Sequence, residues 1–456
     1  MDLTGKNVLI VGFGKTGEAL AGFLVRRGAK VTVSEIREED ALGRRPALWK
    51  RRGVLFETGR HLLSTFLKAD LIIPSPGAAS LPEIKAAKKA GVQALSEIEL
   101  AARFLKGKIV GITGTNGKST TATLAHKILK EAGYLSRLAG NIGIPLISFA
   151  DRSRDRHVHV TEISSFQLEH TETFRPWASV LLNISRNHLD WHGTFEEYFN
   201  AKKRLFLNQG SGDIAILNAD DRLVAGMAAR IRARVYLFSR LRPVRRGAFL
   251  KDGWIILRDG VKEEKLMRAG EIPLPGLHNL ENALAAALIG WVAGAGVRTI
   301  RSSIRTFSGL EHRLESILSV RGVEFINDSK ATTVDATIKA LQSYDRRTVL
   351  ILGGRDKGAD FRLLRRPLRK SVKQVILLGE SADKIAAALR GAVPLAGAGS
   401  MHEAVRLAFA AAWRGDIVLL APACTSFDMF KNFEARGRAF KREVRKLRDS
   451  FQGKSS

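Results

Sequence analysis

Gly-Ile-Thr-Gly-Thr-Asn-Gly-Lys-Ser-Thr, residues 111–120, lies between an apolar run at 108–113 and a helix-like run at 122–131. A glycine-rich turn between a strand and a helix lets backbone N–H groups point at phosphate oxygens, and the helix N-terminus adds its positive end. In such a loop Lys118 neutralises the β- and γ-phosphates and Ser119 ligates Mg²⁺. The usual pattern has glycine where this chain has Ile112. The stretch therefore predicts a variant triphosphate loop, with ATP as the expected ligand. The residues expected to hold it are Gly111, Thr113, Gly114, Thr115, Asn116, Gly117, Lys118, Ser119 and Thr120.

Outward from this loop, apolar strands alternate with helix-like runs along the whole chain, which is typical of an α/β protein. Residues 6–12, 18–27 and 30–34 read as a strand–helix–strand unit near the start. Buried strands are expected at 157–161, 179–183 and 213–217. A small antiparallel insert is expected from the alternating stretches at 235–238 and 254–257. Further apolar runs at 323–326, 348–353, 374–379 and 416–421 end where loops begin, as in an open parallel sheet.

These runs predict three domains, with boundaries near residues 98 and 309. Residues 1–98 are expected to form a Rossmann-like domain and residues 310–456 a second one. Residues 99–309 are expected to form a P-loop ATPase-like domain with a mostly parallel sheet. A final helix is predicted within 431–448, where Phe433, Phe440, Val444 and Leu447 recur at helical spacing.

Composition narrows the class of protein. No apolar stretch reaches the roughly 18 residues of a membrane span, and the N-terminus lacks a signal peptide, so a cytoplasmic protein without a membrane span is expected. The single cysteine excludes an internal disulfide framework. The net charge of +29 allows a nucleic-acid-binding protein, and it also fits a protein that binds polyanionic small molecules, a protein that rests near anionic lipid, or simply a solvated surface rich in arginine. The basic residues are spread along the chain rather than gathered in one arm.

A second glycine-rich loop lies at residues 12–17, Gly-Phe-Gly-Lys-Thr-Gly, directly after a predicted strand. Glu35 follows about 20 residues later, at the end of the next strand, where a ribose-binding acid would stand. This pattern indicates a diphosphate-bearing ligand and leaves a nicotinamide dinucleotide and a sugar nucleotide both open.

Polar groups also follow the strands of the middle segment. Glu162 ends an apolar strand, where a carboxylate near a phosphate loop usually reaches Mg²⁺. His188, Asp190 and His192 lie close together but lack a clear third and fourth zinc ligand, which favours one histidine near Mg²⁺ or phosphate. Asn279 and Asn282 share one helical face, where paired amides suit either a base edge or a helix cap.

In the last segment, polar loops at 327–333, 353–361 and 422–437 each follow an apolar strand. With the preceding Glu-His-Arg at 311–313, they bring Arg313, Lys330, Lys357 and Ser426 to one sheet edge. That set suits a dicarboxylate and a reacting phosphoryl group.

In this order the motifs resemble the Mur ligases of peptidoglycan synthesis over nearly the whole chain. The most specific stretches are Thr-Gly-Thr-Asn-Gly-Lys-Ser from 113, Glu-Ile-Ser-Ser-Phe-Gln-Leu-Glu from 162, Gly-Leu-His-Asn-Leu-Glu-Asn from 276, Asn-Asp-Ser-Lys-Ala-Thr from 327 and residues 426–437. The last stretch is similar to the D-glutamate-adding branch. The Asp-Asn-Pro-Arg type of box found in the diaminopimelate- or lysine-adding branches is absent from the sequence.

The resemblance implies a ligase acting on UDP-N-acetylmuramoyl-L-alanine, D-glutamate and ATP, with two Mg²⁺ ions and a carbamylated lysine at Lys202. It implies a monomer with no specific nucleic-acid partner. The implied catalytic residues are Lys118, Lys202, His188 and Lys330. The implied metal site comprises Ser119, Glu162, His188 and Lys202. Further ATP contacts are implied for Asn279, Asn282, Arg313 and Asp328. The implied substrate contacts are Gly14, Lys15, Thr16, Glu35, Arg37, Asn141, Thr332, Lys357, Ser426 and Phe433.

The chain departs from the family pattern at Asn187, where Asp is usual, at Thr333, where Asn is common, and at Ile36, where a polar residue is usual. Lys203, next to Lys202, leaves the modified lysine ambiguous by one residue. A Mur-type ligase for another amino acid and a nucleotide-dependent nucleic-acid-binding protein remain as alternatives.

Overall fold

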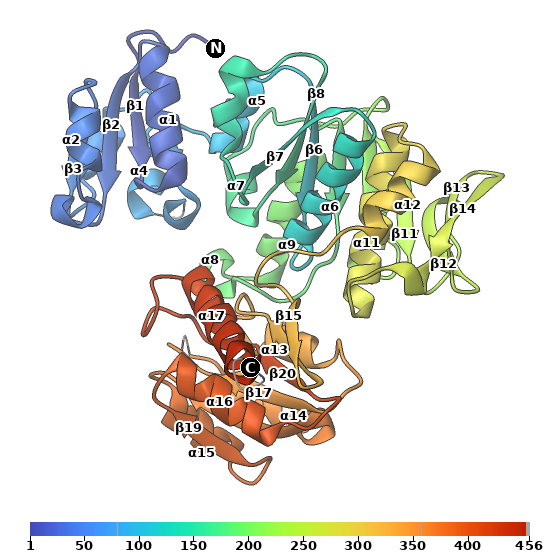
Figure 1. Ribbon diagram of the computed structural model, residues 1–456. Helices are drawn as coiled ribbons and strands as arrows, with labels where there is room; N and C mark the ends of the chain where they lie inside the picture. The colour runs from blue at the N-terminus through green and yellow to red at the C-terminus, as the bar shows by residue number, and fades with distance from the viewer. Residues whose placement is uncertain (80, 357, 453–456) are drawn as a thin grey trace. The chain divides into compact units, whose positions relative to one another are not determined.

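The computed structural model describes residues 1–79, 81–356 and 358–452. These residues form three β-sheets with helices packed against them (Figure 1). The chain divides into two compact units. The first comprises Met1–Ile272 and His278–Thr306, and the second comprises Pro273–Leu277 and Phe307–Ser456. Three α/β regions with mostly parallel sheets confirm the predicted fold class.

The N-terminal sheet has the order β3-β2-β1-β4-β5, and all its neighbouring strands are parallel. α1 follows β1 and buries Leu20, Phe23 and Leu24, so the predicted strand–helix–strand unit is confirmed. The strands are β1 (Asn7–Val11), β2 (Lys30–Glu35), β3 (Leu55–Thr58), β4 (Leu71–Pro74) and β5 (Gln93–Ala94). The helices are α1 (Lys15–Arg26), η1 (Glu39–Leu42), α2 (Arg45–Lys50), α3 (Leu63–Leu67), η2 (Pro76–Ala78), α4 (Pro82–Lys89) and α5 (Glu97–Phe104).

The central sheet has the order β14-β13-β12-β11-β10-β9-β6-β8-β7. Neighbouring strands are parallel from β7 to β12, whereas β13 is antiparallel to β12 and β14 is antiparallel to β13. The strands are β6 (Lys108–Thr113), β7 (Leu135–Gly140), β8 (His157–Glu162), β9 (Ala178–Leu181), β10 (Ile214–Asn218), β11 (Arg234–Ser239), β12 (Arg246–Lys251), β13 (Trp254–Asp259) and β14 (Lys262–Arg268).

The expectation for residues 235–238 was wrong in one respect. They form β11, which continues the parallel part of the sheet, and the antiparallel part begins only after β12. Alternation of apolar and polar residues reports burial on one face of a strand and not the direction of its neighbour.

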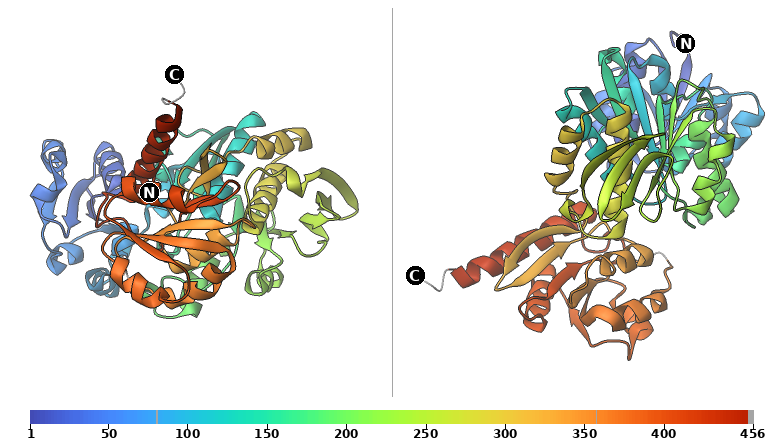
Figure 2. Two further views of the ribbon diagram at one scale, coloured as in Figure 1. Left: turned by 60° about the horizontal axis from the view of Figure 1, so that its bottom comes forward. Right: turned by 90° about the vertical axis from the view of Figure 1, so that its right-hand side faces the viewer.

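In the central region, α6 packs against β7 and β8, and α12 packs on α6. In the right-hand view of Figure 2, the yellow helices α11 and α12 lie on one side of the central sheet. The helices are α6 (Lys118–Glu131), η3 (Leu146–Arg152), α7 (Ser165–Glu169), α8 (Leu189–His192), α9 (Phe195–Lys203), η4 (Arg204–Phe206), α10 (Arg222–Ala225), η5 (Ala228–Arg230), η6 (Ala269–Glu271), α11 (Leu277–Val292) and α12 (Val297–Arg305).

The second unit holds a sheet of order β15-β16-β20-β17-β18-β19, in which only β15 is antiparallel to its neighbour. The final helix is confirmed as α17, which buries Phe440 and Val444. The strands are β15 (Glu315–Val320), β16 (Val323–Asn327), β17 (Thr348–Leu352), β18 (Val372–Leu378), β19 (Leu395–Ala398) and β20 (Ile417–Leu420). The helices are α13 (Val334–Leu341), η7 (Phe361–Leu364), α14 (Arg365–Ser371), α15 (Ala382–Leu389), α16 (Met401–Ala411) and α17 (Phe433–Gln452).

Within the described residues, no helix combines the length and the apolar character that crossing a bilayer requires.

Candidate functional site

The phosphate loop connects β6 to α6 and depends on glycine at two positions. Gly114 has φ of 153° and Gly117 has φ of 84°, both in the region that disfavours other residues. A Cβ at Gly117 would lie 2.2 Å from Oδ1 of Asn282 on α11. Asn282 also donates to Oδ1 of Asn279 (3.2 Å) and accepts from the Thr121 hydroxyl (3.2 Å). The two asparagines therefore hold the loop and the start of α6 from one side.

Side chains inside the loop are also fixed. The Lys118 ammonium donates to the carbonyls of Gly114 and Thr115, both at 3.0 Å. The backbone N–H of Asn116 donates to Oδ1 of Asn183 (2.9 Å), and the Thr115 hydroxyl accepts from the backbone N–H of Ser185 (3.0 Å). The loop after β9 thus braces the phosphate loop, a contact that the sequence did not indicate. Ser119 and Thr120 lie in the first turn of α6 and are buried.

Lys202 on α9 is almost fully buried beneath the loop. Its ammonium donates to the Thr113 hydroxyl (3.2 Å) and the Gly114 carbonyl (3.0 Å). Burial lowers the pKa of Lys202 well below its usual value and nearby Lys118 lowers it further, while Glu162 opposes the change. Lys203 points elsewhere, with Nζ 4.8 Å from the centroid of the Phe199 ring.

Glu162 ends β8 and is buried. Its Oε1 accepts from the side-chain amide of Asn141 (2.8 Å), and its backbone carbonyl accepts from the backbone N–H of Asn141 (2.9 Å). Within the described parts of the chain, Oε2 has no hydrogen-bond partner although it is buried. A buried carboxylate oxygen without a donor is costly unless a cation or a ligand reaches it.

The two histidines after β9 differ in their surroundings. His188 precedes α8 with φ of 54°, and its ring lies 4.9 Å from that of Phe166. His192 is buried, with Nε2 at 2.9 Å from the Ser165 hydroxyl and Nδ1 at 2.8 Å from Oε1 of Glu169. Both ring nitrogens of His192 therefore tie α8 to α7, which gives it a structural role. Of the two histidines, His188 is therefore the better candidate to contact a ligand or a metal ion.

A cavity of about 490 Å³ lies at the carboxyl ends of β1, β2 and β4, where the strand order reverses. Such a switch point is the usual binding crevice of an open α/β sheet. The five predicted N-terminal contacts all line it, as do further residues that the sequence did not single out. The predicted residues are Gly14, Lys15, Thr16, Glu35 and Arg37, and the others include His61, Ser75 and Leu81.

Glu35 is held as a carboxylate in this cavity. Burial opposes the charge, but donors from the Arg37 side chain and from the backbone N–H of Phe13 (2.8 Å) and of Arg37 (3.1 Å) lower the pKa of Glu35 to about 2. Ile36, one of the departures from the family pattern, is 59% exposed and lines the same cavity, so it offers apolar surface there.

In the second unit, polar loops follow β16, β17 and β20, which are neighbours in the sheet. Lys330 and Ser426 come from two of these loops, and Arg313 precedes β15 at the same edge, where Glu315 pairs with Asn327. Lys330 Nζ lies 4.0 Å from the centroid of the Phe433 ring. Thr332 is half-buried beside Lys330, and Ser426 is buried. Residue 357, the remaining predicted contact, lies outside the described residues.

Asp328 follows β16 and is buried. Burial raises the pKa of Asp328 to about 7, although the Arg313 charge and the backbone N–H of Leu314 (3.4 Å) act against this. Thr333 directly precedes α13 and its hydroxyl accepts from the backbone N–H of Ala336 (3.3 Å), so this departure serves as a helix cap. Asn187 accepts from the backbone N–H of His188 (3.0 Å), which Asp would also do.

Sequence reasoning missed Arg436, whose guanidinium is buried within the second unit. It donates to the backbone carbonyls of Ser329 (3.0 Å), Cys424 (3.0 Å) and Thr425 (3.2 Å) and to the Ser329 hydroxyl (3.0 Å). Burial lowers the pKa of Arg436 to about 10, so it stays charged at neutral pH. Arg436 therefore ties α17 to the loops that carry Lys330 and Ser426.

One group of possible metal ligands among the described residues lies elsewhere, at Glu311, His312 and Glu315. The Lys441 ammonium pairs with Oε1 of Glu311 (3.0 Å) and also contacts Glu315. Because this ammonium contacts both carboxylates, the group is better explained as an ion-pair cluster than as a metal site.

The central sheet carries a glycine-rich phosphate loop after β6, a buried lysine beneath that loop, and a carboxylate at the end of the neighbouring strand β8. These features define a nucleotide-binding α/β protein. Residues 6–96 match the family described as Mur ligase MurD-like, N-terminal domain. Residues 112–290 match the Mur ligase middle domain, and residues 312–424 match the Mur ligase, glutamate ligase domain. The chain belongs to the Mur ligase family.

Two relatives make the similarity more particular. A protein of Acidobacterium capsulatum described as UDP-N-acetylmuramoylalanine--D-glutamate ligase is 49% identical over 97% of this chain and 96% of its own length. A protein of Koribacter versatilis with the same description is 46% identical over 98% of this chain and 99% of its own length.

Solved structures share the fold at lower identity. A pseudomurein peptide ligase type C from Methanothermus fervidus matches 97% of this chain and all of its own, with a TM-score of 0.60 and 21% identity. A UDP-N-acetylmuramate-alanine ligase from Thermotoga maritima matches with the same coverage and a TM-score of 0.60 at 18% identity.

Proposed function

We propose that this protein is an ATP-dependent amide ligase that joins D-glutamate to the L-alanyl carboxylate of UDP-N-acetylmuramoyl-L-alanine. The observation that carries the ligase assignment is the phosphate loop with Lys202 buried against its carbonyl and Glu162 at the next strand end. The identity of the amino acid is supported by the descriptions of relatives that match 97–98% of the chain. The product is a peptidoglycan precursor.

Mg²⁺ fits the residues beside the loop. The buried Oε2 of Glu162 lacks a hydrogen-bond partner among the described residues, and Ser119 lies in the first turn of α6, at the end of the loop. We assign one ion to Ser119 and Glu162, and a second to His188 and a modified Lys202. Bound Mg²⁺ supplies positive charge that offsets the negative charge of the transferred phosphoryl group.

Lys202 suits carbamylation because it is buried and its pKa is lowered, which favours the neutral amine that reacts with carbon dioxide. A carbamate is an anion and therefore a ligand for a hard cation. Lys203 packs on Phe199 instead, which favours Lys202 as the modified residue.

The remaining assignments follow the three sheets. The N-terminal cavity with Gly14, Lys15 and Thr16 would hold the UDP diphosphate, with Glu35 and Arg37 near the uracil. Asn141 would contact the muramoyl part. Asn279, Asn282, Arg313 and Asp328 would contact ATP. Lys330, Thr332, Lys357, Ser426 and Phe433 would form the D-glutamate site.

The proposed reaction has two steps. The L-alanyl carboxylate oxygen attacks the γ-phosphorus of ATP, ADP leaves, and an acyl phosphate forms. The D-glutamate amine then attacks the acyl carbon, the C–O bond to phosphate breaks, and the amine loses a proton. Lys118 and the N–H groups of the phosphate loop stabilise negative charge on the phosphoryl oxygens. Lys330 stabilises negative charge on the oxygens next to the acyl carbon.

We further propose that the protein acts as a cytoplasmic monomer. Residues 1–98, 99–309 and 310–456 are assigned to the UDP-substrate, ATP and amino-acid domains. Substrates held by separate domains would require a closing motion during turnover.

Incubation of the protein with UDP-N-acetylmuramoyl-L-alanine, D-glutamate, ATP and Mg²⁺ tests the proposal. One phosphate should be released for each amide product detected by mass spectrometry. Lys118→Ala should lose about 10²-fold or more in rate, as is typical when one such electrostatic contact is removed. Phosphate release without an amide product, or near-normal turnover by the variant, would count against the assignment.

A further inference from the structure

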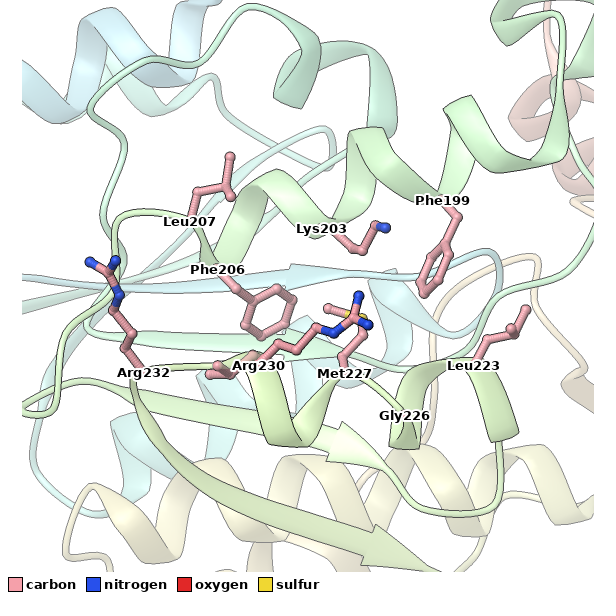
Figure 3. A pocket seen from close by; sticks show the side chains of 10 residues that line it. Phe199, Lys203, Phe206, Leu207, Leu223, Gly226, Met227, Arg230 and Arg232 are labelled. Atoms are coloured by element: carbon pink, nitrogen blue, oxygen red, sulfur yellow. The ribbon is translucent and has the colours of Figure 1, made fainter.

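A second cavity lies in the first unit, between α9 with η4 on one wall and α10 with η5 on the other (Figure 3). Its volume is about 470 Å³, which falls within the range of small-molecule pockets, about 300–1,000 Å³. None of the residues assigned above to ATP, Mg²⁺ or the substrates lines it. The proposed reaction therefore gives this cavity no role.

The floor of the cavity is apolar. Phe206 and Met227 are buried parts of the core, and the Phe199 ring is half-buried beside them. At the rim, Leu207 is 61% exposed and Leu223 is 45% exposed. Exposed leucines above a buried apolar floor form a continuous surface that an apolar ligand would remove from water.

Three cations surround this apolar floor. Figure 3 shows that Lys203 and Arg230 extend from opposite walls into the space near Phe199 and Met227, whereas Arg232 lies at the other end. Within the described ranges, no carboxylate lines the cavity and none of the three cations forms an ion pair with a carboxylate. An apolar cavity with uncompensated positive charge is complementary to an amphiphilic anion.

We propose that this cavity binds a free amphiphilic monoanion, with one short chain or ring system on Phe206 and Met227 and a carboxylate or phosphate group at Lys203 and Arg230. The volume suits one such body rather than the two long chains of a membrane phospholipid. The cations fix the orientation of the ligand, and the apolar floor supplies most of the affinity.

Both walls of the cavity lead to the phosphate loop. Lys203 directly follows Lys202, whose ammonium donates to the Gly114 carbonyl. On the other wall, the Asp221 side chain that caps α10 accepts from the backbone N–H of Ile184 (2.8 Å), and the adjacent Ser185 donates to Thr115. A ligand here therefore touches elements that support the loop without occupying it, so the ligand and a nucleotide bind together.

Titration calorimetry of the full chain with octanoate, 1-octanol and octylammonium tests the proposal. Octanoate should bind saturably, and the neutral and cationic analogues should bind at least about tenfold more weakly, because charge-assisted contacts are lost. Arg230→Glu should weaken octanoate binding by about tenfold or more. Arg222→Glu, which changes an exposed residue of α10 that does not line the cavity, should leave binding unchanged and serves as the control.

Hydrogen exchange locates the site: octanoate should protect residues 199–207 and 223–232, and saturating AMP-PNP should not displace it. The proposal is overturned if octanoate does not saturate, if 1-octanol binds equally well, or if the two glutamate variants weaken binding alike. Competitive displacement by AMP-PNP would also overturn it, because the anion would then occupy the nucleotide site. Binding only to vesicles of an anionic phospholipid would assign the surface to a membrane instead.

Discussion

Replacement of Gly117 by alanine tests the geometry of the phosphate loop. Gly117 has φ of 84°, and its new Cβ would lie 2.2 Å from Oδ1 of Asn282. Gly133, just beyond the other end of α6, has nearly the same φ of 87° with no atom within 4 Å of a Cβ. Gly133→Ala is therefore a matched control that adds the backbone strain, about 1–2 kcal/mol, without the collision.

The collision should displace Asn282 and break its hydrogen bonds to Thr121 and Asn279. At about 1 kcal/mol for each bond, restoring the native loop costs about 2 kcal/mol, which corresponds to about 30-fold weaker nucleotide binding. Calorimetry with AMP-PNP and Mg²⁺ measures this effect, and urea unfolding measures the strain common to both variants. If the affinity of Gly117→Ala for AMP-PNP is within twofold of the affinity of Gly133→Ala, the role assigned to the packing of Asn282 on the loop is refuted.

Three further changes probe the site and its supports. Lys202→Ala should lose turnover and recover part of it with added acetate, which replaces the carbamate, whereas Lys203→Ala should stay near normal without acetate. Arg436→Met should lower the free energy of unfolding by about 3 kcal/mol or more, because three buried carbonyls lose a charged donor. It should also raise KM for D-glutamate more than KM for ATP. For the buried Glu97, whose pKa burial raises to about 7, the unfolding free energy should fall by about 3 kcal/mol as pH rises from 4.5 through 7, and Glu97→Gln should abolish this fall.

Each of these outcomes has a control. Acetate rescue of Lys203→Ala and not of Lys202→Ala would move the modification by one residue. Arg442→Met removes an exposed arginine from the same helix and should leave both KM values unchanged. The unfolding free energy falls as pH rises because the pKa of Glu97 is raised in the folded state. The folded state therefore binds the proton more tightly than the unfolded state does. Equal slopes of unfolding free energy against pH for wild type and Glu97→Gln would contradict the burial argument.

Buried parallel strands were predictable because they are continuous apolar runs that end in turn residues. β1, β6, β17 and β20 are examples, and loops that carry predicted site residues follow them. β15 was not predicted, because it lies at a sheet edge and several of its residues are partly exposed, which blurs the pattern. Whether β11 is parallel or antiparallel to its neighbours could not be predicted either. The alternation of apolar and polar residues reflects burial of one strand face and not the direction of the neighbouring strand.

Arg436 shows how a site residue escaped notice. It stands three residues after Phe433 and four before Phe440, on the apolar stripe that predicted α17. An arginine on that stripe was the available signal, but its acceptors are backbone carbonyls from loops more than 10 residues away in sequence, and only the folded chain brings them together. The same applies to Asn183, whose contact with the phosphate loop joins two distant segments.

The amino acid that the enzyme accepts distinguishes the proposed D-glutamate ligase from its alternatives. Phosphate release should be measured with UDP-N-acetylmuramoyl-L-alanine, ATP and Mg²⁺ in the presence of D-glutamate, L-glutamate, L-alanine, L-lysine or diaminopimelate. We expect phosphate release with D-glutamate and little release above background with the other four amino acids. Preference for another amino acid would identify a different Mur-type ligase. No release with any of the five, together with salt-sensitive DNA binding, would contradict the ligase assignment altogether.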